Sequence, residues 1–166
     1  MTKGKITAIL SNLLQVEVDG PIRQNEICYV LKAGEELMAE VIKINGNIAF
    51  AQLFEAGSGL KAGDQVHFSG ELLEVSLGPG LLSKNFDGLQ NDLEAMPGSF
   101  IQAGQRTPAL DLDEEYEFTP LVKPGAILEA GDAFGEVPEN ALKHTIMLPF
   151  KFEGKWEITE IAPAGK

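Results

Sequence analysis

Long apolar runs, cysteine pairs and clusters of basic residues are all missing from this sequence of 166 residues. No segment approaches the ~18 apolar residues of a membrane-spanning helix, and the first apolar stretch is too short for a signal peptide, so we expect no direct membrane insertion. The single cysteine, Cys28, excludes an internal disulfide and suits the reducing cytoplasm. With 13 basic against 25 acidic residues, the net charge of −12 argues against a nucleic-acid partner.

Motifs for catalysis or for ligand binding are also lacking. The run Gly57-Ser58-Gly59-Leu60-Lys61-Ala62 has the spacing of a dinucleotide-binding fingerprint, but a Gly63-Asp64 turn and a strand pattern follow where that fingerprint needs a helix. The Gly-Lys pairs lack the frame of a P-loop. His67 and His144 stand alone, and the acidic stretch 111–117 is typical of a solvated loop. We therefore predict no catalytic, cofactor-binding or metal-binding residue in this chain.

Short apolar runs separated by glycine-containing turns predict a small six-stranded β-barrel over residues 1–76. Leu14, Val16 and Val18 alternate with polar residues, which indicates a strand with one apolar and one wet face. Asn45-Gly46 lies between the apolar runs 37–44 and 48–54 and predicts a hairpin with a type I′ turn.

The run 48–54 is apolar on both faces. Ile48, Phe50 and Phe54 share one face, and Ala49, Ala51 and Leu53 share the other. We expect the large side chains inside the barrel and the small ones on its outer wall, where they would contact another domain or subunit. Burial under a loop of the same chain would leave the same pattern, so both explanations stay open.

The strand pattern breaks at Leu77-Gly78-Pro79-Gly80, since proline cannot donate to a β-ladder and glycine weakens a strand. Residues 77–97 are predicted to be a connecting segment, with one or two helical turns over 89–96 that Pro97 stops. Further short strands, including 145–148 and 156–161, predict a second β-rich, barrel-sandwich-like domain over 98–166. The fold class is therefore all-β.

The run from Leu77 to Gln90, LGPGLLSKNFDGLQ, resembles the segment that follows the N-terminal barrel in the catalytic A subunit of V-type and archaeal-type rotary ATPases. Earlier runs at 18–26, 38–42, 52–55 and 68–76 occur in the same order as in that family. The chain departs from the family at Asn91-Asp92, where many members have Arg-Pro. It also ends at Lys166, before the P-loop that carries the family's catalysis.

The resemblance implies a barrel that joins those of neighbouring A and B subunits in a ring above an alternating hexamer. Residues 98–166 would be the bulge domain that B lacks, with the peripheral stalk as a candidate partner. The full subunit would use ATP, ADP and Mg, and would couple ATP synthesis or hydrolysis to proton or sodium transport in a cytoplasmic head peripheral to the membrane. This chain alone is expected to be inactive. The implied structural or interface residues are Leu77, Gly78, Pro79, Gly80, Phe86, Asp87, Gly88 and Gln90, together with Ala49, Ala51 and Leu53.

Three other interpretations compete with this one. The glycine-rich turns after Val122 resemble those of biotinyl or lipoyl carriers, but Lys143 lacks the neighbours of a modified lysine. The F-type subunits and the B subunit share the barrel, although the bulge-like region argues against both. A barrel that binds a small ligand leaves no fixed spacing in a sequence and stays open.

Overall fold

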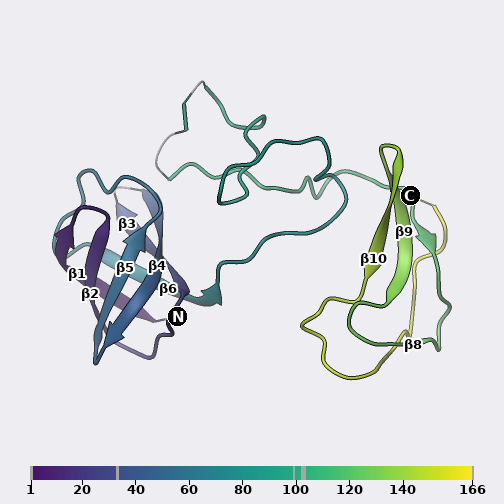
Figure 1. Ribbon diagram of the computed structural model, residues 1–166, viewed down its shortest axis with the longest axis horizontal. Coiled ribbons are helices and arrows are strands. Elements are labelled where there is room, and N and C mark those ends of the chain that lie inside the picture. The colour runs from purple at the N-terminus through teal and green to yellow at the C-terminus, as the bar shows by residue number, and fades with distance from the viewer. Residues whose placement is uncertain (1, 33, 99, 102–103, 166) are drawn as a thin grey trace. The chain divides into compact units, whose positions relative to one another are not determined.

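The computed structural model describes residues 2–32, 34–98, 100–101 and 104–165. By its internal contacts the chain divides into two compact units (Figure 1). The first unit comprises Met1–Val75 and Met96–Arg106, and the second comprises Ser76–Ala95 and Thr107–Lys166. Strands and turns make up the described residues, without a helix among them, so the predicted all-β class is confirmed.

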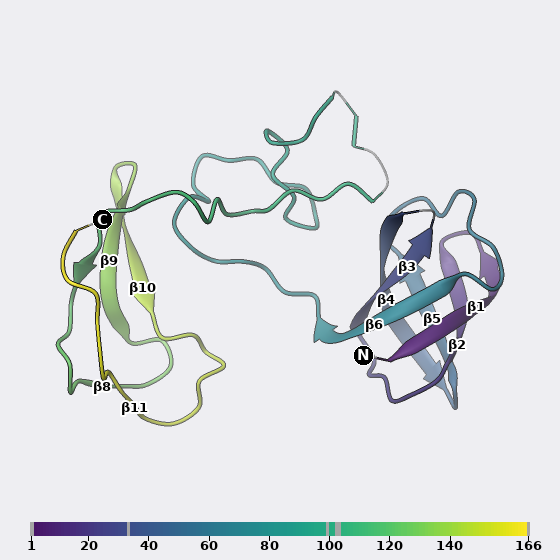
Figure 2. The ribbon, with the colours of Figure 1, turned by 180° about the vertical axis from the view of Figure 1, so that it is seen from behind.

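Six antiparallel strands close the first unit into a barrel, in the order β1-β2-β5-β4-β3-β6. Figure 2 shows β6 between β1 and β3, the pairing that completes the closure. Closure leaves no strand edge exposed, which protects a small β domain from edge-to-edge association. The strands are β1 (Lys3–Leu10), β2 (Leu13–Val18), β3 (Glu26–Lys32), β4 (Glu35–Asn45), β5 (Ile48–Leu53) and β6 (Gln65–Leu72).

The β4–β5 hairpin forms where the sequence predicts it, but with a different turn. Asn45 pairs with Ile48, so the two loop residues are Gly46 and Asn47. Gly46 has φ 61°, whereas Asn45 and Asn47 are not among the described residues with positive φ. A positive φ at the first loop position alone is the pattern of a type II′ turn, and the predicted type I′ is wrong. Both types match the twist of the flanking strands, so the hairpin itself is unaffected.

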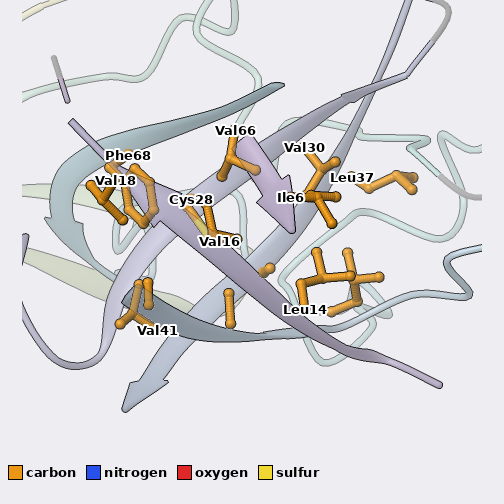
Figure 3. Packing of buried hydrophobic residues seen from close by; sticks show 14 residues of the cluster. Ile6, Leu14, Val16, Val18, Cys28, Val30, Leu37, Val41, Val66 and Phe68 are labelled. Carbon is orange, nitrogen blue, oxygen red and sulfur yellow. The ribbon is translucent and has the colours of Figure 1, made fainter. Parts of the chain in front are cut away.

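The core of the barrel is made of aliphatic side chains from all six strands, with one aromatic ring and one thiol. Figure 3 shows Phe68, Cys28, Val66 and Val30 among the buried side chains; Phe68 opposes Cys28, and Val66 opposes Val30, on the paired strands β6 and β3. At Gly4 a Cβ atom would lie only 2.7 Å from the carbonyl oxygen of Glu17, so β1 and β2 approach closely there. The cluster consists of Ile6, Leu14, Val16, Val18, Cys28, Val30, Leu37, Ala39, Val41, Ala49, Ala51, Leu53, Val66 and Phe68.

The second unit is built from shorter strands. A three-stranded sheet has the order β10-β9-β7, and β11 pairs with β8 in a second sheet. Its buried apolar residues among those described are Ala109, Leu128 and Val137. Phe152 packs edge-on against Trp156 with ring centroids 5.2 Å apart. The strands are β7 (Thr119–Pro120), β8 (Ile127–Leu128), β9 (Ala133–Glu139), β10 (Leu142–Met147) and β11 (Trp156–Glu157).

The helical turns predicted over 89–96 do not form. The segment contains separate turns instead, and side-chain oxygens capture the backbone amides that a helix would use. Asp87 Oδ1 accepts hydrogen bonds from the amides of Leu89 and Asn91, and Asp92 Oδ1 accepts one from Glu94. Aspartate competes with helix formation in this way because its short side chain reaches nearby amides.

Candidate functional site

The face of β5 that was expected on the outer wall lies inside the barrel. Ala49 and Ala51 are fully buried, and Leu53 is 2% exposed. The strand order places β5 beside β2, where Ala51 opposes Leu14 and Ala49 opposes Val16. Directly opposed residues point to the same face of a sheet, and Leu14 and Val16 line the core. The prediction of an outer wall made of Ala49, Ala51 and Leu53 is therefore wrong; a barrel of six strands is narrow, and small side chains fit its interior.

The outer wall carries the large side chains of the same strands. Phe50 is half-buried, with Lys43 Nζ 6.0 Å from its ring centroid, and Phe54 is 40% exposed. The strands concerned, β1, β2, β5 and β4, are consecutive around the barrel. We call this surface the apolar wall; it comprises Leu10, Leu13, Ile42, Ile48 and Phe50 on these strands and Phe54 directly after β5. Polar side chains lie among them on the same outer face, since Gln15 and Lys43 oppose Phe50 and Glu17 opposes Ile48. On β6 the outward residues Gln65 and His67 are polar.

The Gly-Pro-Gly segment binds a buried carboxylate of the second unit. Glu139, at the end of β9, is 5% exposed. Its Oε1 accepts hydrogen bonds from the amides of Gly80 at 2.7 Å and Leu82 at 3.0 Å, and its Oε2 lies 2.7 Å from Nδ1 of His144 on β10. Burial by itself would raise the pKa of Glu139, but the hydrogen bonds from Leu82, His144 and Gly80 outweigh it and hold the pKa below the ordinary value. The Gly80 and Leu82 amides are thus already occupied by a carboxylate of the same chain.

The two glycines of this segment fit close contacts. Gly80 has φ +96°, and a Cβ atom there would lie 2.6 Å from the hydroxyl of Tyr116. At Gly78 it would lie 3.0 Å from a methyl group of Leu110. Leu77 is 81% exposed, while Pro79 is half-buried. Of the four residues, the glycines are the ones that this packing constrains.

The second half of the resembling segment binds mainly to itself. Phe86 forms an isolated bridge with Asp92, and Asp87 accepts hydrogen bonds from the amides of Leu89 and Asn91 and from Asn91 Nδ2. Gln90 exchanges two hydrogen bonds with the backbone of Ser76, one as donor and one as acceptor. Gly88 is exposed, with open space around it.

Asn91 and Asp92, where the chain departs from the family pattern, are both buried. Asn91 Oδ1 accepts a hydrogen bond from the Thr107 amide at 3.1 Å, and the Asp92 carbonyl accepts one from the Thr107 hydroxyl. The Asp92 carboxylate lies 3.1 Å from Lys84 Nζ, and this hydrogen bond is the main cause that lowers the pKa of Asp92. The two residues therefore close the segment onto the chain where it re-enters the second unit.

Two further carboxylates, those of Glu26 and Glu55, accept hydrogen bonds within the first unit. The sequence pattern identified neither of them. Glu26, which is 3% exposed, accepts hydrogen bonds from the amides of Arg23 and Gly70. Glu55 binds the amide of Gly104 and the guanidinium of Arg106. Glutamates are rarely buried, and from sequence they resemble ordinary surface residues. A glutamate directly before an apolar run, as at Glu26-Ile27, is at most a weak signal.

The remaining candidates occupy ordinary positions. Burial raises the pKa of the Cys28 thiol to about 12, with a smaller contribution from Glu26, which makes it a poor nucleophile. Lys143, close to the β9–β10 turn, forms an ion pair with Glu136 at 2.6 Å. Among the described residues, no group of three His, Cys, Asp or Glu side chains is arranged to hold a metal ion. The same residues include no helix long and apolar enough to cross a membrane.

Two family models match the two units. The model described as "ATP synthase alpha/beta family, beta-barrel domain" matches residues 6–70, and "ATPsynthase alpha/beta subunit barrel-sandwich domain" matches residues 107–166. The first covers most of the closed barrel, and the second covers β7 to β11. Gly78, Gly80 and the loop that Glu139 holds lie between the two matches.

Relatives match nearly the whole chain. The V-type ATP synthase alpha chain of Treponema denticola is 41% identical over 99% of this chain, and alpha chain 1 of Treponema pallidum is 42% identical over 99%. The alpha chain of Borreliella burgdorferi is also 42% identical over 99%. The chain spans 28–29% of the length of these relatives. With both domain models matched in order and the relatives aligned across the connecting loop, the chain belongs to the ATP synthase alpha/beta family.

Proposed function

We propose that this chain is the non-catalytic N-terminal part of the catalytic A subunit of a V-type ATP synthase and that it supports assembly of the alternating A/B hexamer. The observation that carries the proposal is the 41% identity to a V-type alpha chain over 99% of this chain, which includes both domains and the loop between them. In the full subunit, ATP or ADP with Mg would be bound by residues outside this chain, and ATP synthesis or hydrolysis would be coupled to proton or sodium transport.

The arrangement of the described residues fits an assembly role better than a catalytic one. The Gly80 amide of the Gly-Pro-Gly segment and the nearby Leu82 amide both donate to Glu139. A cradle for phosphate offers free amides to an anion, and a buried carboxylate already fills that position here. We therefore infer that the isolated chain does not bind ATP tightly, which a calorimetric titration with Mg-ATP checks.

The apolar wall is the surface that we assign to neighbouring barrels. It replaces the wall of Ala49, Ala51 and Leu53, which are in the core. Large side chains such as Phe50 and Phe54 on a closed barrel suit a contact with another subunit, because aromatic residues are enriched at protein interfaces. The partners are the B subunits and, through the ring, other A subunits. We assign the peripheral stalk to the second unit, and we place the assembled head in the cytoplasm at the membrane surface.

The assembly role is tested by binding to the B subunit of the source complex. Light scattering after gel filtration should show the chain alone as a monomer, because a heterologous ring contact lacks its complement. Mixed with the B subunit it should form a complex. Phe50→Asp should weaken that complex at least tenfold, whereas Gln65→Asp, which adds the same charge to the outward face of β6, should not. Equal binding of both variants would exclude the apolar wall as the contact.

A biotinyl or lipoyl carrier module is the alternative function, and a separate measurement tests it. Lys143 lies near a hairpin turn, as a carrier lysine does, but it is paired with Glu136 and the family matches do not support a carrier. Intact mass spectrometry after expression with active biotin and lipoyl ligases should show no added mass. A biotin or lipoyl mass on Lys143 would contradict the proposed function.

A further inference from the structure

Residues 76–95 form a loop that is bonded to itself at several points. At its base the side-chain amide of Gln90 exchanges two hydrogen bonds with the backbone of Ser76, and Lys84 pairs with Asp92 across the loop. The Leu93 amide donates to the Asn85 carbonyl, also across the loop. We call this segment the docked loop. Its bonds link residues within 20 positions of one another, so the loop can hold its shape as one body.

Among the described residues, two that lie outside the docked loop hold it by hydrogen bonds within the second unit. One is Thr107, which binds Asn91 and Asp92 near the point where the chain returns. The other is Glu139, which is 57 to 59 residues away from the amides that it holds. Among the hydrogen bonds of the described residues, those to Glu139 are the ones that join the docked loop to the β10-β9-β7 sheet.

We propose that the Glu139 carboxylate is a clasp that holds the docked loop on the sheet, and that the loop detaches and re-attaches as one unit when the clasp opens. Two amides on one oxygen of Glu139, and a loop that is otherwise bonded to itself and to Thr107 near the point where the chain returns, favour a single opening event at the sheet over gradual fraying. The docked loop is the first part of the second unit that follows β6 in the chain, and the clasp holds it on the β10-β9-β7 sheet.

Few groups lie close enough to the Glu139 carboxylate to affect its ionisation. His144 on β10 binds its second oxygen, and the side chain of His144 is 28% exposed. Tyr116 is also close, but its hydroxyl donates to Glu114 at 2.7 Å. Residues 76–82 contribute amides and no titratable side chain. The carboxylate thus has one ionisable partner, His144, and two neutral amide donors in the loop.

Amide hydrogen exchange, followed residue by residue by NMR, tests the clasp in the whole chain. In the unmodified protein the amides of Gly80, Leu82 and Leu93 should exchange with one common protection factor, lower than that of the paired amides of β9 and β10. Glu139→Gln keeps the shape of the side chain and removes its charge. It should reduce protection at these loop amides by roughly ten- to hundredfold, because hydrogen bonds to charged groups are the stronger ones. Glu136→Gln, at a paired glutamate on the same strand, should leave them unchanged.

The pH profile separates a clasp from simple packing. Protection of the Gly80 and Leu82 amides should fall as the pH drops through the pKa of Glu139 in the native protein. This fall should be smaller in Glu139→Gln, where Asp92, whose pKa Lys84 also lowers, still titrates within the loop. Unchanged protection in Glu139→Gln would overturn the proposal, as would different protection factors for Gly80 and Leu93 in the unmodified protein. If Glu139→Gln also exposed the β9 and β10 amides, the loop would belong to the sheet's own cooperative unit, and the separate opening would be refuted.

Discussion

The inward direction of Ala51 can be tested by enlarging it. Ala51 is fully buried on β5, opposite Leu14, and its neighbour Gln52 is exposed on the outer face. Ala51→Leu adds three carbon atoms inside a closed barrel, whereas Gln52→Leu places the same side chain in solvent. If the strand faced the other way, as its sequence first suggests, the two effects would be exchanged.

The size of the effect follows from the packing. Inserting extra carbon atoms into a filled core typically costs about 1–3 kcal/mol, because neighbours must leave their preferred rotamers. The neighbours here are other fully buried side chains, and the strands are closed by hydrogen bonds on both sides, so the barrel cannot open along an edge. For a unit of this size each kcal/mol lowers the melting temperature by about 4–8 °C. Ala51→Leu should therefore lower it by roughly 5–20 °C.

Circular dichroism during heating measures both variants against the unmodified chain. Gln52→Leu should melt within about 3 °C of the unmodified protein, because surface substitutions usually stay within 0.5 kcal/mol. The reasoning would be refuted if Ala51→Leu were as stable as the unmodified chain, or if Gln52→Leu were the more damaging substitution.

Three further predictions follow from individual residues. Because burial raises the pKa of Cys28 to about 12, its alkylation at pH 8 should be far slower in the native protein than in denaturant, and equal rates measured by mass spectrometry would contradict its burial. Gly80→Ala should destabilise the second unit by about 1–2 kcal/mol, because φ is +96° there, whereas Gly88→Ala, with open space around it, should be neutral in urea unfolding followed by Trp156 fluorescence. Because the pKa of Glu139 is lowered in the native protein, its contribution to the free energy of unfolding is fully present above the ordinary glutamate pKa of about 4.3. That contribution is lost as the pH falls through the lower native pKa. Glu139→Gln should therefore flatten the acid side of the plot of stability against pH. An acid limb identical in both proteins would show that Glu139 does not contribute it.

Local signals in the sequence were sufficient for the barrel and its main hairpin. The alternation of Leu14, Val16 and Val18 with polar residues fixes one face of β2, and all three are buried. Asn45-Gly46 marks the β4–β5 turn because glycine adopts positive φ without a steric penalty. The two-residue loop lies one position further along the chain, at Gly46-Asn47, and such a shift is invisible in the sequence.

The direction of β5 could not be predicted, because both of its faces are apolar. The alternation of residues along the strand then fits either orientation equally well. The strand with which β5 pairs determines which of its faces is buried. That partner is β2, three strands earlier in the chain, and its inward residues Leu14 and Val16 oppose Ala51 and Ala49. Non-local pairing of this kind leaves no mark on the residues of β5 themselves.

The contacts of Glu139 could not be predicted from the sequence either. A glutamate between Pro138 and Asn140, at a hairpin turn, is normally exposed. Its burial depends on amides 57 to 59 residues away, at Leu82 and Gly80, and on His144 across the hairpin. The segment that carries the resemblance contains the two amides, but the carboxylate that binds them lies outside that segment.

Replacement of the corresponding part of a relative tests the central claim most directly. The alpha chain of Treponema denticola, in which about 28% of the length matches this chain, can receive residues 1–166 in place of its own matching segment. Co-expressed with its B subunit, the chimera should form an A/B hexamer that hydrolyses ATP, and Phe50→Asp should reduce hexamer formation more than Gln65→Asp does. A chimera that folds and stays soluble but forms no hexamer with the B subunit would contradict the assembly role.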